Sequence, residues 1–265
     1  MPTPSLVITT SRQPNPAHLA EASRWAGLLG APLVDRNDLS LARLAQTHGA
    51  PGVLVIGGDR VTYYEPEREL LYFFHPGMSR RRLRNLKADN GDPMITAMGI
   101  GPGDSVLDCT LGRGADATVA AHVVGPEGRV VGIEKVPVLA WLTIEGLQHY
   151  EIEDDATREA MRRVEAHCAD YADHLPAQPD DSFDVVYFDP IFEQMVEGAS
   201  AMIPLRQLAS HEPLTREAVA EAQRVARRRV VIKQPARSPL WERLGIEVRI
   251  VSGGKSHVEY GVVEG

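Results

Sequence analysis

A turn containing two glycines is flanked by two acidic residues. The run DCTLGRGADA, residues 108–117, begins with the last two residues of an apolar stretch at 105–109 and leads into a helical pattern. Such a strand, turn and helix is how many α/β enzymes hold a nucleotide-like ligand, because glycine lets the backbone approach the ligand closely. The expected ligand contacts from this turn are Asp108, Thr110, Gly112, Gly114, Ala115 and Asp116.

The glycine spacing alone also satisfies a loose dinucleotide-binding pattern, and Glu134 ends the next apolar run where a ribose-binding acid belongs. Charge separates the two ligands. A dinucleotide would bring an anionic pyrophosphate against Asp108 and Asp116, whereas S-adenosylmethionine would bring an ammonium and a sulfonium. Two unit charges about 4 Å apart interact by roughly 4 kcal/mol at an effective dielectric of about 20. The turn therefore favours S-adenosylmethionine over a dinucleotide, and over a purely structural tight turn, which would leave both acids unexplained.

Two further acids end the apolar runs that follow. Glu134 closes VVGIE and can accept hydrogen bonds from both ribose hydroxyls, and its neighbour Lys135 would reach the same ligand. Asp170, in HCAD, is a candidate acceptor for the adenine amino group, although the same residue would equally suit a helix cap.

A carboxylate, a proline and an aromatic ring end the apolar run FDVVYF. Asp189 and the Pro190 carbonyl are placed to accept hydrogens from an amino group on a nucleobase, whose delocalised lone pair must be turned toward the methyl group. Phe192 can stack on a base that has left its helix, the alternative being a β-turn with this ring in the core. The run resembles the Asp/Asn-Pro-Pro-aromatic motif of amino-methyltransferases, with Ile191 replacing the second proline. Asp189, Pro190 and Phe192 are therefore the candidate catalytic residues.

Three basic residues recur at helical spacing in SRRRLRNLK. A helix would gather Arg80, Arg84 and Lys87 on one face, where they would hold nucleic-acid phosphates or form an ordinary solvated face. Lys233 and His257 are further candidates for phosphate or base contacts, with a solvated strand end as the alternative for each. Because the formal net charge is −8, any contact with nucleic acid must be local.

The elements that position these residues alternate regularly after the segment that ends at Pro93. Seven strands are expected, at residues 105–109, 129–134, 163–169, 183–189, 228–233, 247–252 and 258–263. Strands alternating with helical periods are typical of a parallel sheet wound by βα units. Only GGKSH separates the last two strands, and so short a turn joins antiparallel neighbours. The sequence predicts an α/β, Rossmann-like seven-stranded sheet with an antiparallel last strand.

A different pattern precedes this sheet. Short β-rich runs at 6–10, 53–58, 61–64 and 70–74 alternate with amphipathic stretches around 16–29 and 37–48. We predict a small N-terminal α/β domain at 1–76 and a methyltransferase domain at 77–265, in keeping with ordinary domain sizes.

Composition narrows the class of protein. With 43% hydrophobic and 24% charged residues, the chain has no apolar run near the roughly 20 residues of a membrane span. No basic segment followed by an apolar one opens the sequence, so we expect a cytoplasmic protein. Cys109 and Cys168 lack metal-ligand spacing and are expected to be small buried residues, so neither a disulfide framework nor a metal is predicted.

Seven motifs occur in an order that resembles a known family: VLDCTLGRGADA, GIEK, HCAD, VVYFDPIF, MIPLRQL, VVIKQP and GGKSHVEYGV. From about residue 73 to the end, the chain resembles the bacterial small-subunit ribosomal RNA guanine-N2 methyltransferases and their uncharacterised Gram-positive relatives. The resemblance implies contacts to S-adenosylmethionine at Ala115, Asp116, Glu134, Lys135, Ala169, Asp170 and Asp189. It implies a substrate role for the HPGMSRRR segment and for Arg206, and ribosomal RNA or the small ribosomal subunit as partner.

Three hypotheses follow from the residues. The first is an S-adenosylmethionine-dependent methyltransferase acting on an exocyclic amino group of a base, guanine N2 in ribosomal RNA under the resemblance. The second is a methyltransferase or oxidoreductase acting on a small molecule, against which the Asp-Pro-x-Phe motif speaks. The third is an inactive RNA-binding relative, against which the presence of both Asp189 and Glu134 speaks.

Overall fold

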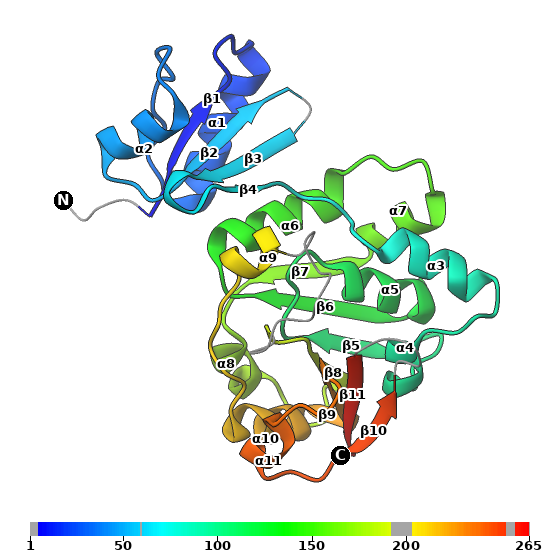
Figure 1. Cartoon of the computed structure of the whole chain (residues 1–265). Helices are drawn as coiled ribbons and strands as arrows, with labels where there is room; N and C mark the ends of the chain where they lie inside the picture. The colour runs from blue at the N-terminus through cyan, green and yellow to red at the C-terminus, as the bar shows by residue number, and fades with distance from the viewer. Residues whose placement is uncertain (1–4, 59, 192–202, 253–257, 265) are drawn as a thin grey trace. The chain divides into compact units, whose positions relative to one another are not determined.

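A computed structural model describes residues 5–264 except 59, 192–202 and 253–257 (Figure 1). The chain divides into two compact units. One holds the described residues up to Phe74 together with residues 203–207, and the other holds the rest. The domain limits of 1–76 and 77–265 inferred from the sequence stay a prediction.

The first unit is a four-stranded sheet with helices packed on it. Its elements are β1 (Val7–Thr10), α1 (Pro16–Leu29), α2 (Leu41–His48), β2 (Val53–Gly57), β3 (Arg60–Glu65), η1 (Pro66–Arg68), β4 (Leu70–Tyr72) and most of α9 (Ile203–Leu208). The strand order is β1-β2-β3-β4, with β1 and β2 parallel and the later pairs antiparallel. This confirms the small N-terminal sheet. The helix predicted from residue 37 begins instead at Leu41, because the Ser40 side chain caps it.

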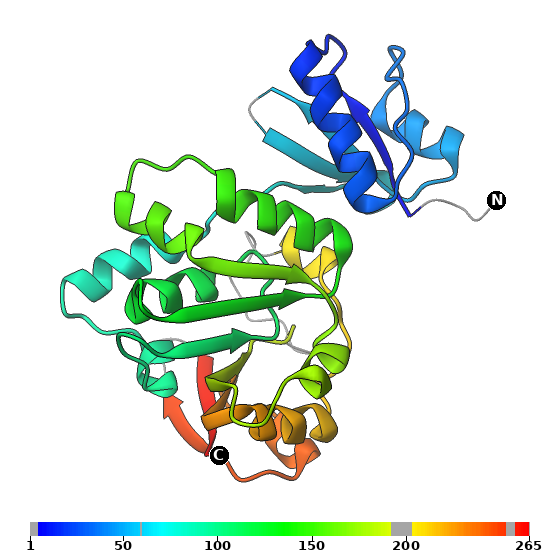
Figure 2. The same cartoon turned by 180° about the vertical axis from the view of Figure 1, so that it is seen from behind.

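The second unit is an α/β layer structure. Its elements are α3 (Ser79–Lys87), α4 (Pro93–Met98), β5 (Ser105–Asp108), α5 (Ala115–Val124), β6 (Arg129–Glu134), α6 (Pro137–His149), α7 (Asp155–Arg162), β7 (Val164–Cys168), α8 (Tyr171–His174), η2 (Leu175–Ala177), β8 (Phe183–Phe188), α10 (Arg216–Val225), β9 (Ala226–Pro235), α11 (Leu240–Leu244), β10 (Arg249–Ser252) and β11 (Val258–Glu264). Helices α4, α5 and α6 lie on one face of the sheet, and α8, α10 and α11 lie on the other (Figures 1 and 2).

The strand order of the second sheet is β10-β11-β9-β8-β5-β6-β7. Strands β5 to β9 pair in parallel, and β11 is antiparallel to both β9 and β10. The predicted seven-stranded sheet with an antiparallel last strand is therefore confirmed. The strand order changes direction between β5 and β8, and parallel α/β sheets bind ligands outside the carboxyl ends of the strands at such a point.

Burial explains why these runs form central strands. Val106 and Leu107 in β5, and Val185 and Val186 in β8, are fully buried, as expected for strands covered by helices on both faces. The strand predicted at 228–233 is longer, Ala226–Pro235, because it pairs with β11 over its last seven residues. In the part of the chain that the structure describes, every helix is too short or too polar to span a lipid bilayer.

Candidate active site

The glycine turn joins the end of β5 to the start of α5. Gly112 and Gly114 have φ values of 54° and 73°, a left-handed conformation that suits glycine. A Cβ on Gly114 would also lie 3.2 Å from the Leu147 side chain. The Thr110 backbone N–H donates to the Asp108 carboxylate over 3.0 Å, and the Thr143 hydroxyl donates to the Gly112 carbonyl over 2.7 Å. The turn is thus held from both the strand and α6.

Glu134 lies at the end of β6 beside this turn. Its side chain is buried, and its two carboxylate oxygens accept hydrogen bonds from the backbone N–H groups of Gly112 (3.0 Å) and Val136 (2.9 Å). Burial raises the pKa of Glu134, against the lowering effect of these backbone donors. Each carboxylate oxygen can accept a second hydrogen bond. Glu134 therefore orders the turn and still has capacity for a ribose hydroxyl.

Asp189 follows β8 and is tied to the same turn. Its backbone N–H donates to the Thr110 hydroxyl over 2.5 Å, and its carboxylate accepts a hydrogen bond from the Lys233 ammonium over 2.6 Å. Burial raises the pKa of Asp189, while Lys233 opposes this rise. The carboxylate that follows the central strand is thus placed beside the glycine turn, and its role in catalysis stays a prediction.

Asp116, in the first turn of α5, lies in a network of charged and polar side chains. Lys233 Nζ is 3.2 Å from its carboxylate, the Tyr187 hydroxyl donates to it over 2.8 Å, and Arg82 forms an ion pair with it. Burial alone would raise the pKa of Asp116, but Lys233 and Arg82 together lower it below the ordinary value. The sequence analysis expected the negative charge of Asp116 to attract the cationic groups of the ligand, but Lys233 and Arg82 already balance that charge.

The network nevertheless remains acidic. Arg82 also pairs with Asp92 over 2.7 Å, so two cations face the carboxyl groups of Asp92, Asp108, Asp116 and Asp189. Burial and the neighbouring Asp116 raise the pKa of Asp108 well above its ordinary value, which reduces this excess of negative charge. The acidic side chains at this edge of the sheet fit a ligand with an ammonium and a sulfonium, and the buried Glu134 beside the glycine turn fits its ribose hydroxyls. The same acidic side chains disfavour an anionic pyrophosphate.

A second group of charges lies at the ends of β6 and β7. Lys135 Nζ is 2.7 Å from the Asp170 carboxylate and 2.5 Å from that of Glu212. Asp170 also caps α8, accepting from the Ala172 N–H over 2.9 Å. Asp170 therefore has the helix-capping role that the sequence analysis gave as its alternative. Contacts of Lys135, Ala169 and Asp170 to the cofactor stay predictions.

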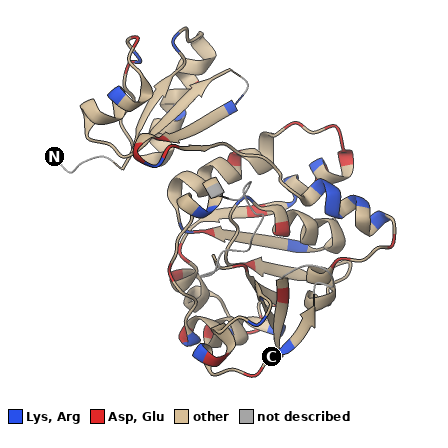
Figure 3. Cartoon of the chain, in the orientation of Figure 1, with Lys and Arg blue, Asp and Glu red and all other residues tan. Residues whose placement is uncertain are grey.

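The residues predicted to bind substrate are dispersed. Arg80, Arg84 and Lys87 are exposed on α3, and the ribbon of this helix is marked at several positions as Lys or Arg (Figure 3). Lys233 was expected to contact phosphate or base, but two carboxylates hold its ammonium. Arg206 lies half-buried in α9, in the other unit.

Two predicted residues lie outside the described residues, namely Phe192 and His257. Their roles in stacking and in substrate contact stay predictions. The predicted buried cysteines differ in exposure, because Cys109 is buried and Cys168 is half-buried.

Sequence reasoning missed Arg82, Tyr187 and Glu212 as parts of the site. A signal existed for Arg82, since Leu83 and Leu86 mark the apolar side of this helix and Arg82 stands four residues before Leu86. No comparable signal marks Tyr187 or Glu212, whose partners Asp116 and Lys135 lie 71 and 77 residues away in the chain.

The strand order and the glycine turn beside buried acids define an S-adenosylmethionine-dependent methyltransferase. The chain belongs to the family described as putative SAM-dependent methyltransferase, whose model matches residues 42–257.

Several known proteins are similar to this chain. The chain is 36% identical to the uncharacterized protein YpiP of Bacillus subtilis over 258 residues, covering 97% of this chain and 99% of that protein. It is 30% identical over 237 residues to ribosomal RNA small subunit methyltransferase J of Pseudomonas aeruginosa, covering 85% and 84%. The crystal structure of a SAM-dependent methyltransferase from Neisseria gonorrhoeae superposes with a TM-score of 0.61 at 18% identity, over 97% and 95% of the two chains, and supports the fold.

Proposed function

We propose that this methyltransferase transfers the methyl group to an exocyclic amino group of a nucleic-acid base, namely guanine N2 in ribosomal RNA. The observation that carries the proposal is the position of Asp189 and Pro190 just after the central strand β8, where the Asp189 backbone N–H donates a hydrogen bond to Thr110 of the glycine turn. The names of relatives such as the Pseudomonas aeruginosa enzyme support ribosomal RNA as the substrate class.

The cofactor contacts in this proposal come from the carboxyl edge of the sheet. Glu134 accepts hydrogen bonds from the ribose, the turn at 112–114 lies against the amino acid part, and Asp170 accepts from the adenine amino group. When bound, S-adenosylmethionine supplies an electrophilic methyl group on a sulfonium.

Asp189 and Pro190 act on the acceptor amine. The Asp189 carboxylate and the Pro190 carbonyl accept its two hydrogens, which turns the nitrogen lone pair out of conjugation with the ring and toward the methyl group. Lys233 holds one carboxylate oxygen of Asp189, and among the described residues no donor holds the other oxygen, which we assign to the amine. Catalysis on this account is positioning, which lowers the barrier by several kcal/mol when the reacting atoms are held in line. Phe192, outside the described residues, is proposed to stack on the base.

The exposed face of α3 is proposed to hold RNA phosphates. Arg80, Arg84 and Lys87 are exposed there, whereas Arg82 turns inward and pairs with Asp92 and Asp116. The helix thus combines an outward basic face with an inward anchor next to the site.

The test is a comparison of modified nucleosides in ribosomal RNA from cells with and without the gene. Loss of N2-methylguanine at one position, restored by the wild-type gene and not by an Asp189→Ala variant, is expected. The purified enzyme should then methylate RNA from the deletion strain, presented as free RNA and as small subunits in parallel. If the deletion leaves every ribosomal RNA nucleoside unchanged and neither RNA form accepts a methyl group, the proposed function is wrong.

A further inference from the structure

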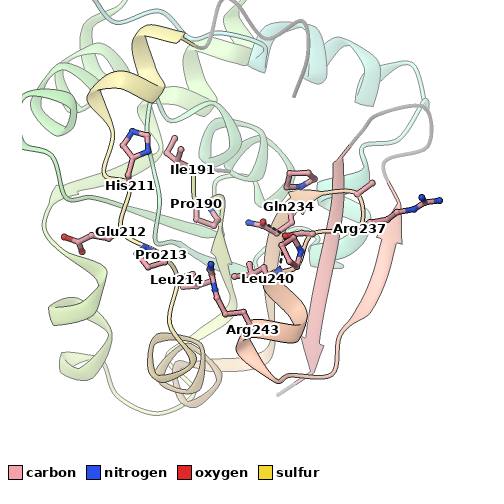
Figure 4. Close-up of a pocket in the computed structure, with 14 residues that line it drawn as sticks. Pro190, Ile191, His211, Glu212, Pro213, Leu214, Gln234, Arg237, Leu240 and Arg243 are labelled. Carbon is pink, nitrogen blue, oxygen red and sulfur yellow. Dashed lines mark hydrogen bonds between the residues drawn. The ribbon is translucent and has the colours of Figure 1, made fainter. Parts of the chain in front are cut away.

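A cavity opens beside Pro190 at the carboxyl ends of β8 and β9 (Figure 4). The cavity is open to solvent. Pro190, Leu214 and Leu240 give it an apolar part, and the Gln234 side chain reaches into it. The cavity therefore adjoins the residue whose carbonyl is proposed to accept from the target amine.

Gln234 and Pro190 line the same cavity. The last residue pair between the parallel strands β8 and β9 is Phe188 opposite Ile232, and Pro190 and Gln234 each follow that pair by two positions. Neighbouring strands are about 4.8 Å apart. Figure 4 shows the amide end of Gln234 directed toward Pro190. A planar ligand lying over these strand ends would meet both residues.

The Gln234 amide oxygen faces the loop after β9. The Ser238 hydroxyl donates a hydrogen bond to Gln234 Oε1 over 2.9 Å, and the hydroxyl oxygen accepts one from the Leu240 backbone N–H over 3.2 Å. The amide oxygen is thereby engaged within the loop after β9, and the amide NH₂ group is the end left for a ligand.

Gln234 is also only 6% exposed. Among the described residues, Ser238 is the one hydrogen-bond partner of its side chain. The amide nitrogen has no acceptor among the described residues, and it is left to solvent or to a ligand in the cavity. The cavity therefore offers the donor Gln234 Nε2 to a ligand that carries a hydrogen-bond acceptor.

We propose that this cavity receives the target base and that Gln234 selects guanine by donating a hydrogen bond to its O6 carbonyl oxygen. This inference rests on the proposed function. Guanine presents O6 and N7 as two neighbouring acceptors, whereas adenine presents the N6 amino group in place of O6. Glutamine commonly reads adenine by using its oxygen and its nitrogen together, but here Ser238 engages the oxygen. An amide that offers donors alone matches guanine.

The variants that test this are Gln234→Glu, Gln234→Ala and Ser238→Ala, with Gln223→Glu as the matched control. Gln223 lies on α10 and does not line the cavity. Thermal unfolding and S-adenosylmethionine titration of each variant show whether the fold and cofactor site are intact. The substrates are ribosomal RNA from the deletion strain and two synthetic RNAs spanning its methylated position. One carries guanine there, and the other carries 2-aminopurine, which keeps the N2 amino group and lacks O6.

The wild-type enzyme and Gln223→Glu should prefer guanine over 2-aminopurine by about three- to tenfold in kcat/KM, the value of one neutral hydrogen bond. Gln234→Ala should abolish the preference, and Gln234→Glu should reduce guanine methylation further, because its carboxylate repels O6. Ser238→Ala should reduce the preference for guanine over 2-aminopurine, because the Gln234 amide loses its hydrogen bond to Ser238 and can rotate.

Equal kcat/KM of the wild-type enzyme for the two synthetic RNAs would overturn the role of Gln234 while leaving the proposed function intact. So would an unchanged guanine preference in a folded Gln234→Glu variant. If the wild-type enzyme transfers no methyl group to any of these RNAs, or methylates adenine, both the inference and the proposed guanine specificity are wrong.

Discussion

Lys233 and Asp189 form an ion pair at the carboxyl edge of the sheet, with 2.6 Å between Nζ and Oδ2. The same ammonium lies 3.2 Å from the Asp116 carboxylate, so one side chain of β9 links the end of β8 to the first turn of α5. Although burial alone would lower the pKa of Lys233, Asp116 and Asp189 raise it, and the ammonium stays charged. The carboxylate proposed to bind the amine is thereby held in place by a fixed cation.

Lys233→Met should lower turnover by about ten- to a hundredfold, the effect of losing a hydrogen bond to a charged group. Burial raises the pKa of Asp189 and Lys233 opposes the rise, so removing Lys233 should raise that pKa further. The carboxylate would then protonate at higher pH, and activity should be lost at a higher pH as the solution is acidified. Single-turnover methylation across a pH series measures this.

Lys233→Arg is the matched control, since it keeps a positive charge and should restore much of the rate. Other groups also face Asp189 and titrate or carry charge; they are Asp108, Asp116, Arg82, Tyr187 and Tyr260. If the loss of activity toward acidic pH occurs at the same pH in a folded Lys233→Met variant as in the wild type, Lys233 does not set the pKa of Asp189.

Asp189→Ala should reduce turnover far more than cofactor affinity, because the interaction it removes matters most as the amine lone pair turns toward the methyl group. Asp189→Asn should be milder, since its amide oxygen still accepts a hydrogen bond. Single-turnover rates beside cofactor titration separate the two effects. Wild-type methylation by Asp189→Ala would place the chemistry elsewhere.

Glu134→Ala should weaken binding of S-adenosylmethionine and S-adenosylhomocysteine by about 1.5–3 kcal/mol, since hydrogen bonds to a charged carboxylate are lost. NAD should not bind the wild-type enzyme, because its pyrophosphate would meet an edge of the sheet where, among the described residues, four carboxyl groups face two cations, Arg82 and Lys233. Calorimetric titration with the three ligands tests both statements. Unchanged affinity in a folded Glu134→Ala variant would show that this residue only supports the turn.

Replacing Arg80, Arg84 and Lys87 together with Gln should weaken RNA binding and flatten its salt dependence by about one unit per lost phosphate contact. These side chains are exposed, so the melting temperature should hardly change. Filter binding over a range of salt concentrations measures the slope. If the salt dependence of RNA binding is unchanged and the melting temperature falls, the exposed basic face of α3 has a structural role.

Arg82→Gln, on the same helix, should behave in the opposite way. It removes a partly buried partner of Asp92 and Asp116, with 19% of its side chain exposed, and should cost roughly 2–4 kcal/mol of stability. Urea unfolding measures the loss. An Arg82→Gln protein as stable as the wild type would mean that the ion pairs contribute little to the fold.

The sequence determined the elements and the chemistry of their ends. The positions of β5, β6 and β8 could be predicted from apolar runs that each end in an acidic residue, because a strand buried on both faces is apolar along most of its length. The short GGKSH segment determined that the last two strands are antiparallel. The glycine turn, Glu134 and Asp189 could be named in advance because each stands at a strand end, where side chains from different strands meet.

Tertiary structure decided which side chains become partners. Arg80 and Arg82 are two residues apart in one helix, yet packing exposes the first and pairs the second with Asp116, 34 residues away. Lys233 lies between two acids because β9 is next to β8, an order that no local pattern encodes. Sequence periodicity reflects residues that are near neighbours in the chain. Ion pairs, and hydrogen bonds such as that between Ser238 and Gln234, depend on strand order, register and loop conformation, which only the folded chain establishes.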